Sequence, residues 1–250
     1  MNPKSVARKL LPKRVIQRAE ASYRKGRAHT LQVAYGFPAR KLRVIGVTGT
    51  NGKTTTCALI NTMLKKAGYK TAMFTTAIVE MDGEQTMNTL HKTVPDTSGL
   101  LAFLKMAKQK KVDFVVLELT SHALDQHKVS GIPIEVAVMT NLTQDHLDYH
   151  GSMEAYAASK ARLFNDYCKP KVVVLNRDDR WYEYFYSQAV GKTYSYGFNQ
   201  QASLPISDQD LTSKGSSFKL AFKADKLSFK TRLPGKFNLY NAAAAASVGL

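Results

Sequence analysis

The chain has 250 residues, of which 44% are hydrophobic and 10% aromatic, and its formal net charge is +17. This length fits one large domain or two small ones, and no apolar run approaches the roughly 20 residues of a membrane span. Two cysteines, Cys57 and Cys168, are too few for a disulfide framework. The first residues contain no apolar secretory core, so a cytoplasmic protein is expected.

The positive charge is concentrated at the amino terminus. Residues 1–43 contain twelve Lys or Arg and one acid, Glu20, and therefore carry +11 of the +17. We divide the chain into a basic arm at residues 1–42 and a domain at residues 43–250. The arm is expected to be a solvated helix packed on the domain, and weak contact with an anionic membrane is the second interpretation. The sequence lacks the aromatic-basic interleaving that stacks bases, so no nucleic-acid partner is expected.

From residue 43 onward, short β-branched runs alternate with helical segments. This alternation predicts an α/β fold with a doubly wound, mostly parallel sheet that is covered on both faces. Asp82-Gly83 predicts a hairpin turn. Strands are predicted at 43–48, 70–76, 113–119, 135–140 and 171–176, and helices at 53–67, 97–110 and 153–167.

The carboxyl-terminal part of the chain changes character. Residues 192–232 contain short alternating strands, at 217–222 and 227–231 among others, and predict a small β-rich subdomain. Residues 237–250 begin an alanine-rich helix, and the chain then stops. Because a domain seldom ends a few residues into a helix, we expect the sequence to be part of a longer protein.

Residues 46–56 (GVTGTNGKTTT) follow a predicted strand and open a predicted helix. Glycines let the backbone wrap around phosphate oxygens, and the helix amino terminus adds positive potential. Lys53 is placed to reach the β- and γ-phosphates, and the Thr54 hydroxyl to bind Mg²⁺. The usual spacing of a nucleotide-binding P-loop would need glycine at Val47, so this loop is a variant. The predicted ATP-binding residues are Gly49, Thr50, Asn51, Gly52, Lys53, Thr54 and Thr55.

Two side chains follow neighbouring predicted strands. Glu118 lies at the end of DFVVLEL, and His146 comes shortly after EVAVMT. Because ligands bind at the carboxyl ends of parallel strands, both side chains are expected at the same edge of the sheet. A carboxylate there suits Mg²⁺, which prefers oxygen ligands.

Six segments in chain order resemble the Mur ligase family, which includes the folylpolyglutamate synthases. Together the segments extend over residues 43–250. The block at 141–151 is most similar to family members that add the third residue of the peptidoglycan stem peptide. The segments are GVTGTNGKTTT at 46–56, ELTSHAL at 118–124, NLTQDHLDYHG at 141–151, YAASK at 156–160, NRDD at 176–179 and GKFNLYN at 235–241.

The resemblance implies a role for individual residues. Lys53 and Thr54 act on the ATP phosphates with one Mg²⁺, and Glu118 and His146 bind a second Mg²⁺. The amine of Lys160 carries CO₂ as a carbamate, which makes Lys160 a third metal ligand. Asn238 and Asn241 hold the adenine. The residues implied to face the UDP-sugar peptide are Thr75, Thr76, Thr93, Thr120, Gln126 and Lys128.

The resemblance also implies an activity. The family joins a carboxylate to an amine through an acyl-phosphate, which predicts an ATP-dependent carbon–nitrogen ligase. The expected substrates are a UDP-N-acetylmuramoyl peptide and an amino acid, in peptidoglycan synthesis. Two alternatives remain: a related ligase with another carboxylate substrate, of the folylpolyglutamate or amino-acid polymer type, and an ATP-binding partner protein without catalysis.

The chain departs from the family in three places. The 42 residues before the first strand are too few for the UDP-binding domain of such ligases. The carboxyl-terminal domain that brings the amino acid is absent from the sequence. Thr93-Val94-Pro95 replaces Thr-Thr-Pro. Lys128 stands where the family has an arginine, so the two parallel hydrogen bonds that a guanidinium can donate are lost.

Overall fold

Strand β1 (Arg43–Thr48) lies near the middle of one large sheet in this computed structural model, which describes residues 13–89 and 93–250. Within these residues, eleven strands follow the order β11-β10-β9-β8-β7-β6-β1-β5-β2-β3-β4. The strands from β2 to β9 in this order are parallel, so the expected α/β fold with a mostly parallel sheet is confirmed. Those following β1 in sequence are β2 (Thr71–Phe74), β3 (Ile78–Met81), β4 (Glu84–Met87), β5 (Phe114–Glu118), β6 (Val136–Met139), β7 (Val172–Asn176), β8 (Lys192–Gly197), β9 (Leu204–Thr212), β10 (Gly215–Phe222) and β11 (Asp225–Thr231).

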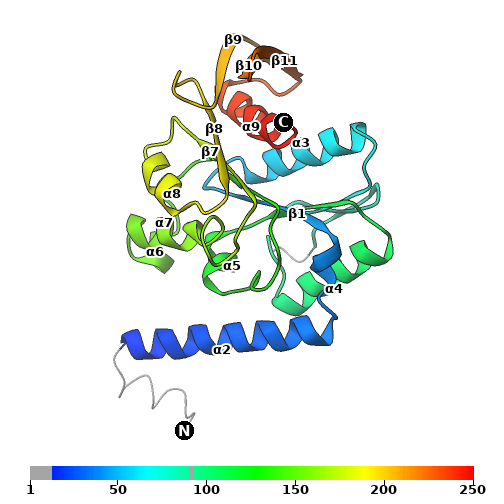
Figure 1. Ribbon diagram of the computed structural model, residues 1–250, viewed down its shortest axis with the longest axis vertical. Helices are drawn as coiled ribbons and strands as arrows, with labels where there is room; N and C mark the ends of the chain where they lie inside the picture. Colours follow the sequence, from blue (N-terminus) through cyan, green and yellow to red (C-terminus); the bar gives the residue numbers. More distant parts are fainter. Residues whose placement is uncertain (1–12, 90–92) are drawn as a thin grey trace.

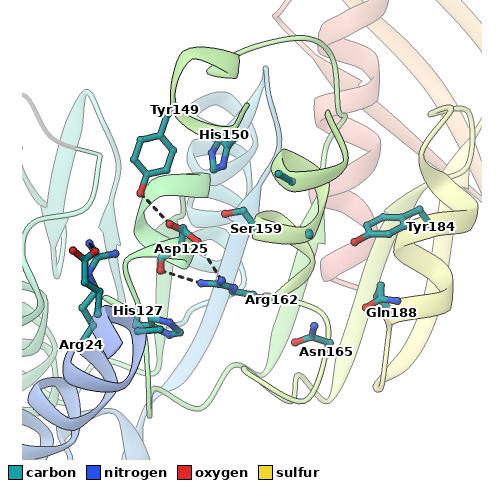
Figure 2. A pocket seen from close by; sticks show the side chains of 14 residues that line it. Arg24, Asp125, His127, Tyr149, His150, Ser159, Arg162, Asn165, Tyr184 and Gln188 are labelled. Carbon is teal, nitrogen blue, oxygen red and sulfur yellow. Dashed lines mark hydrogen bonds and ion pairs between the residues drawn. The ribbon is translucent and has the colours of Figure 1, made fainter. Parts of the chain in front are cut away.

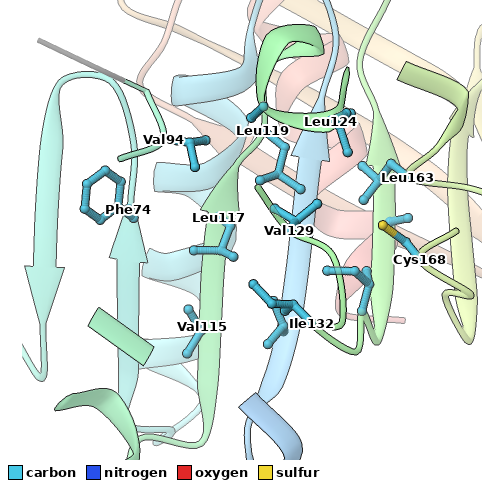
Figure 3. Packing of buried hydrophobic residues seen from close by; sticks show 14 of the residues in the cluster. Phe74, Val94, Val115, Leu117, Leu119, Leu124, Val129, Ile132, Leu163 and Cys168 are labelled. Atoms are coloured by element: carbon cyan, nitrogen blue, oxygen red, sulfur yellow. The ribbon is translucent and has the colours of Figure 1, made fainter. Parts of the chain in front are cut away.

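Helices cover both faces of this sheet (Figure 1). Ile45 and Val47, on one face of β1, pack against α3 (Lys53–Lys66) and α9 (Lys236–Val248). Val44 faces the other way, into the core beneath α4 (Thr97–Gln109), α5 (Ser121–Asp125), α7 (Met153–Ala161) and α8 (Tyr182–Gln188). Figure 3 shows part of this second core, where Val115 and Leu117 of β5 meet Val129 and Ile132. Because both faces are buried, the central strands are continuous apolar runs.

The two ends of the sheet are antiparallel. Asp82 and Gly83 both have positive φ and join β3 to β4, which confirms the predicted hairpin turn. At the other end, β9 pairs in parallel with β8, and β10 and β11 continue from it as a meander. The β-rich segment near residues 192–232 is therefore an extension of the main sheet, since β8 pairs along its length with β7.

Helix α7 is shorter than its sequence predicts. The prediction extends to residue 167, but the helix ends at Ala161 and residues 162–168 form turns and a bend. The Asn165 carboxamide accepts a hydrogen bond from the Tyr167 amide at 3.0 Å. Before this turn, the amides of Leu163 and Phe164 already bond to carbonyls three residues back, so the chain tightens directly after Ala161 and the helix ends there.

Within the basic arm, residues 13–34 form the single helix α2 (Lys13–Ala34), followed by the short 3-10 helix η1 (Pro38–Lys41). Figure 1 shows α2 lying across one end of the molecule, below α4 and α5. Ala28 is buried, and the Gln32 amide donates to the carbonyl of Ser130 at 3.2 Å. The helix therefore packs on the domain, as expected. Residues 1–12 lie outside the described part of the chain.

Of the helices described, none combines the length and the apolar character needed to cross a bilayer. The carboxyl ends of β1, β5 and β6 meet at one edge of the sheet, because Val47 pairs with Glu118 and Thr48 with Met139. The loops that follow these three strands form the site described next.

Candidate functional site

The loop between β1 and α3 is held so closely by its neighbours that two positions accept only glycine. A Cβ on Gly49 would lie 1.8 Å from the Thr140 hydroxyl, and one on Gly52 would lie 2.1 Å from the Asn241 carboxamide oxygen. Gly52 has φ +82 and caps the amino terminus of α3. The amides of α3 thus begin at a tight backbone bend, which is the geometry that binds phosphate at a helix terminus.

Asn141, just after β6, clamps the tip of this loop. Its carboxamide accepts from the Asn51 amide at 3.0 Å and donates to the Asn51 carbonyl at 3.0 Å. The Thr140 hydroxyl also donates to the Asn51 carbonyl, at 2.7 Å. Asn141 begins a block that the sequence singles out, but no role follows from its type. Its contact with a loop 90 residues away is visible only in the fold.

Lys53 begins α3 and lies over the loop. Its ammonium group donates to the Thr50 carbonyl at 2.8 Å. Burial lowers the pKa of Lys53, and the Glu118 and Asp145 carboxylates partly offset that shift. Lys53 is therefore a partly desolvated cation beside two acids, at the position from which a P-loop lysine reaches terminal phosphates.

Thr54 and Glu118 meet at the mouth of the loop. The buried Glu118 carboxylate accepts from the Thr54 hydroxyl at 2.8 Å, and from the amide and hydroxyl of Thr76, each at 3.0 Å. A threonine hydroxyl and a carboxylate side by side are the hard oxygen donors that Mg²⁺ selects. The structure thus brings together these two predicted metal ligands.

Lys160 is 1% exposed and lies beneath the loop. Its Nζ donates to the Gly49 carbonyl at 2.8 Å and lies 4.6 Å from the centre of the Tyr156 ring. Burial, followed by the Lys53 charge, holds the pKa of Lys160 well below its ordinary value, and Asp145 opposes the shift. A lowered pKa favours the neutral amine, which is the form that reacts with CO₂.

His146 lies at the same edge in a left-handed conformation (φ +52), and its side chain is 46% exposed. Its Nε2 lies 3.5 Å from the Asp145 carboxylate. Two further histidines surround it: the His122 ring centre is 5.0 Å from that of His146 and 5.6 Å from that of His150. The sequence blocks contain His122 and His150, but sequence analysis assigned them no role.

Predicted metal ligands are therefore only partly gathered. Across residues 13–89 and 93–250, no three His, Cys, Asp or Glu side chains converge on one point.

Burial lowers the pKa values of His122 and His150, and neighbouring histidines lower them further, so both are biased toward the neutral form at neutral pH.

Asn238 and Asn241 lie on α9, against the other side of the loop. The Asn241 carboxamide donates to Asn238 at 3.3 Å, and Asn238 donates to the Pro234 carbonyl at 2.8 Å. Asn241 also lines a cavity of about 280 Å³ beside Asn51 and Gly52. Asn238 lies behind that cavity, outside its lining. The other residues that line it are Asn141, Asn176, Asp178, Asp179, Phe237 and Tyr240.

The predicted substrate residues separate into two groups. The Thr76 and Thr93 hydroxyls lie 2.7 Å apart, and the Thr76 hydroxyl also contacts Glu118, so Thr76 connects Thr93 to that carboxylate. Thr75, in contrast, is fully buried, and its hydroxyl donates to the Ile78 carbonyl at 2.8 Å. Thr75 therefore lies inside the turn that precedes β3.

The remaining predicted substrate residues lie on or near α5. Thr120 caps α5 by accepting from the Ala123 amide at 3.1 Å, and half-buried Gln126 follows the helix beside the Tyr149 hydroxyl. Lys128 donates to the Val94 carbonyl at 3.2 Å, which brings it next to the segment that contains Thr93.

The family model that matches this chain is the Mur ligase middle domain, over residues 47–249. A UDP-N-acetylmuramoyl-L-alanyl-D-glutamate–2,6-diaminopimelate ligase of Syntrophomonas wolfei is 39% identical over 218 residues. That match covers 86% of this chain and 44% of the relative. A UDP-N-acetylmuramyl-tripeptide synthetase 2 of Oceanobacillus iheyensis is 39% identical over 215 residues, covering 84% and 44%. The chain thus spans less than half the length of these relatives.

Solved structures also superpose on this chain. A structure of a UDP-N-acetylmuramoyl-L-alanyl-D-glutamate–2,6-diaminopimelate ligase superposes with a TM-score of 0.78 at 33% identity, and covers 89% of this chain and 46% of its own. The apo form of the L. casei FPGS superposes with a TM-score of 0.67 at 20% identity, over 89% and 61%. The second likeness shows the shared fold alone.

Proposed function

The chain belongs to the Mur ligase family, in the region of its middle domain, and from this premise we propose that it binds Mg-ATP and activates a carboxylate. The protein is then an ATP-dependent ligase that joins an amino acid to a UDP-N-acetylmuramoyl peptide in peptidoglycan synthesis. The relatives' names describe ligases of this kind, and the matched segments contain the phosphate loop and the residues around it.

The observation that carries the proposal is the contact between Thr54 and Glu118. It places a hydroxyl and a buried carboxylate 2.8 Å apart at the first turn of α3, beside the ammonium group of Lys53. This arrangement combines a phosphate grip with oxygen donors for a divalent cation. When Mg²⁺ is bound there, it neutralises charge on the phosphoryl group.

Lys53 and the amides of residues 52–54 hold the β- and γ-phosphates of ATP, because the Thr50 and Asn51 amides donate to Asn141. Asn241 and the cavity beside it receive the nucleoside, with Asn238 orienting the Asn241 carboxamide. Because hydrogen bonds with Thr140 and Asn141 hold the loop, it is preorganised for the phosphates. The substrate carboxylate attacks the γ-phosphorus from the acceptor side, and ADP leaves.

The acceptor side comprises Thr76, Thr93, Thr120, Gln126 and Lys128. Their hydroxyl, amide and ammonium groups hold the UDP-muramoyl peptide so that its carboxylate lies in line with the leaving ADP. The amine of the incoming amino acid then attacks the acyl-phosphate carbon, a new C–N bond forms and inorganic phosphate leaves. The amine proton passes to solvent or to a neighbouring base.

Lys160 acts as a carbamate. The ammonium form first loses a proton to solvent; the neutral amine then attacks CO₂, forms an N–C bond and releases a second proton, so that a cation becomes an anion. That anion and the exposed His146 would be the residues that hold a second Mg²⁺, which would supply positive charge to the reacting phosphoryl group. The lowered pKa of Lys160 supports this proposal, because only the neutral amine adds CO₂.

Phosphate release by the full-length protein tests the proposed function. Release should require Mg-ATP, a UDP-N-acetylmuramoyl dipeptide and an amino acid together. Release with a folate or an amino-acid polymer in place of the UDP substrate would show a related ligase. Absence of turnover with every such pair, despite ATP binding, would show a nucleotide-binding protein without catalysis.

A further inference from the structure

A cavity of about 750 Å³ lies away from the phosphate loop, between α2 and the outer face of α7. Figure 2 shows it bounded by Arg24 on one side and by Tyr184 and Gln188 of α8 on the other, with Arg162 at its centre. Tyr149 and His150 of α6 (Leu147–His150) form its upper rim in that view. Its volume is in the range of sites that hold small molecules.

The charged groups that line this cavity balance in sign. Arg24 lies 3.5 Å from the Glu20 carboxylate, and Arg162 lies 3.2 Å from that of Asp125. All four side chains are between 30% and 42% exposed. The Arg24–Glu20 pair is long and partly solvated, so it is weak, and either side chain can exchange its partner for a charged group of a ligand at little cost. Arg162 also donates to the carbonyls of Leu124 and Asp125, which fix its charge in the lining. A ligand with one ammonium and one carboxylate group matches this lining, whereas a ligand of a single charge sign leaves one type of group unmatched.

The two ends of the cavity differ in potential. His127 is 4% exposed, and its Nδ1 has no hydrogen-bond partner. Burial, and then the charges of Arg162, Lys25 and Arg24, lower the pKa of His127 to about 4, and Asp125 alone opposes that shift. The Tyr149 hydroxyl donates to Asp125 at 2.9 Å, on the side of Asp125 away from His127 (Figure 2). A carboxylate is therefore favoured near Arg24 and His127, and an ammonium group near Asp125 and Tyr149.

The remaining surface suits a short carbon chain with a polar end. Ala155 and Ala158 of α7 present methyl groups to the cavity. Asn165 and Gln188 contribute carboxamides that can both donate and accept hydrogen bonds. An amino acid with a polar or charged side chain satisfies both kinds of surface.

We propose that this cavity binds a free zwitterionic amino acid, at a site separate from the phosphate loop. Helix α7 divides the two sites, because Tyr156 and Lys160 contact the loop while Ala158 and Arg162 line the cavity. Helix α2, which forms one wall, precedes the residues that match the family model. The inference therefore rests on this chain's own residues and not on the proposed ligase activity.

Calorimetry on the whole chain without ATP tests the site, with L-lysine and 2,6-diaminopimelate as zwitterions. Cadaverine carries only ammonium groups and pimelate only carboxylates, so both serve as matched single-sign probes. We expect the zwitterions to bind at least about tenfold more tightly than either probe. Arg24→Gln and Asp125→Asn should each weaken binding by roughly tenfold. Arg27→Gln, on an exposed part of the same helix outside the cavity, should leave binding unchanged.

Several results would overturn the proposal. They are no saturable binding of either zwitterion at about 10 mM, equal binding of cadaverine or pimelate, or equal loss in Arg27→Gln. Far-UV circular dichroism of Arg24→Gln shows whether α2 still forms, and Asp125→Asn gives a second test outside that helix. Competition by Mg-ATP would place the ligand at the nucleotide site instead. Lys53→Ala should leave amino-acid binding intact, so this proposal and the ligase proposal can fail independently.

Discussion

The phosphate-loop side of the site (residues 49–56 with Thr140, Asn141 and Asn241) and the acceptor side (Thr76, Thr93, Thr120, Gln126 and Lys128) share one sheet edge but are held differently. On the loop side, backbone groups of Asn51 are paired with Asn141 and Thr140, and glycines admit no larger residue. On the acceptor side, Thr76 and Thr93 meet through one exposed hydroxyl contact, and Lys128 reaches a carbonyl at 3.2 Å. The loop is thus preorganised for one ligand, whereas the acceptor side retains donors that a substrate can recruit.

The variant with the largest expected effect changes the phosphate-loop side alone. Lys53→Ala removes the ammonium group from the loop, and we expect Mg-ATP affinity to fall by about a hundredfold or more, since a charge-assisted contact to phosphate is lost. Calorimetric titration with Mg-ATP measures this. Lys66→Ala, at the other end of the same helix, is the matched control and should bind normally. Unchanged affinity in Lys53→Ala would refute the loop assignment.

Asn141 tests whether the clamp, rather than the loop sequence, preorganises the site. Asn141→Asp loses the donor to the Asn51 carbonyl and puts a carboxylate against that oxygen and near the phosphates. We expect Mg-ATP affinity to fall by roughly a hundredfold in this variant and by roughly tenfold in Asn141→Ala, which loses hydrogen bonds without adding charge. If the alanine variant bound as weakly as the aspartate variant, repulsion would not be the cause. If both bound normally, Asn141 would not position the loop.

Lys160 lies beneath the loop, and its titration should appear in the stability of the protein. Burial and the Lys53 charge depress its pKa, so below an unfolded pKa of about 10.4 the folded state binds fewer protons than the unfolded chain. The stability of the wild type should therefore rise with pH in that window, relative to Lys160→Met, which fills similar space without titrating. The slope is at most about 1.4 kcal/mol per pH unit.

Chemical denaturation of both proteins between about pH 7 and about pH 10, under CO₂-free conditions, measures this difference. If the free energies of unfolding of the two proteins changed in parallel with pH, the pKa of the Lys160 amine would not be depressed. Added bicarbonate supplies a separate readout, because carbamate formation should raise ligase activity in the wild type and leave Lys160→Met inactive.

Much of the fold follows from the sequence, because periodicity records which faces are buried. Val44 and Ile45 point to opposite cores, and the apolar run that contains them predicts a strand covered on both sides. Strand β1 has the predicted bounds. The predicted end of α7 was wrong because the backbone tightens into turns directly after Ala161, which helical spacing does not reveal.

The site is less readable from the sequence, because its contacts join distant segments. The loop residues are recognisable from glycine spacing, since tight bends restrict residue type. Asn141, His122 and His150 acquire their surroundings only when β5 and β6 are placed beside β1. The burial of Thr75 likewise depends on the turn before β3, in which its hydroxyl donates to the Ile78 carbonyl. The cavity beside α2 has no sequence signature, because it is formed by helices that pack only in three dimensions.

The smallest expected effect tests the acceptor side alone. Thr93→Val keeps the β-branched shape but removes the hydroxyl that pairs with Thr76 at 2.7 Å. One neutral hydrogen bond contributes about 1 kcal/mol, so we expect the KM for the UDP-muramoyl substrate to rise by about fivefold. Mg-ATP affinity should stay within about twofold of the wild type, because Thr93 contacts no loop residue in the described part of the chain. Thr86→Val, on exposed strand β4, is the control for the exchange itself. A loss of ATP affinity in Thr93→Val would show that Thr76 and Glu118 transmit changes to the loop, and the two sides would then act as one unit.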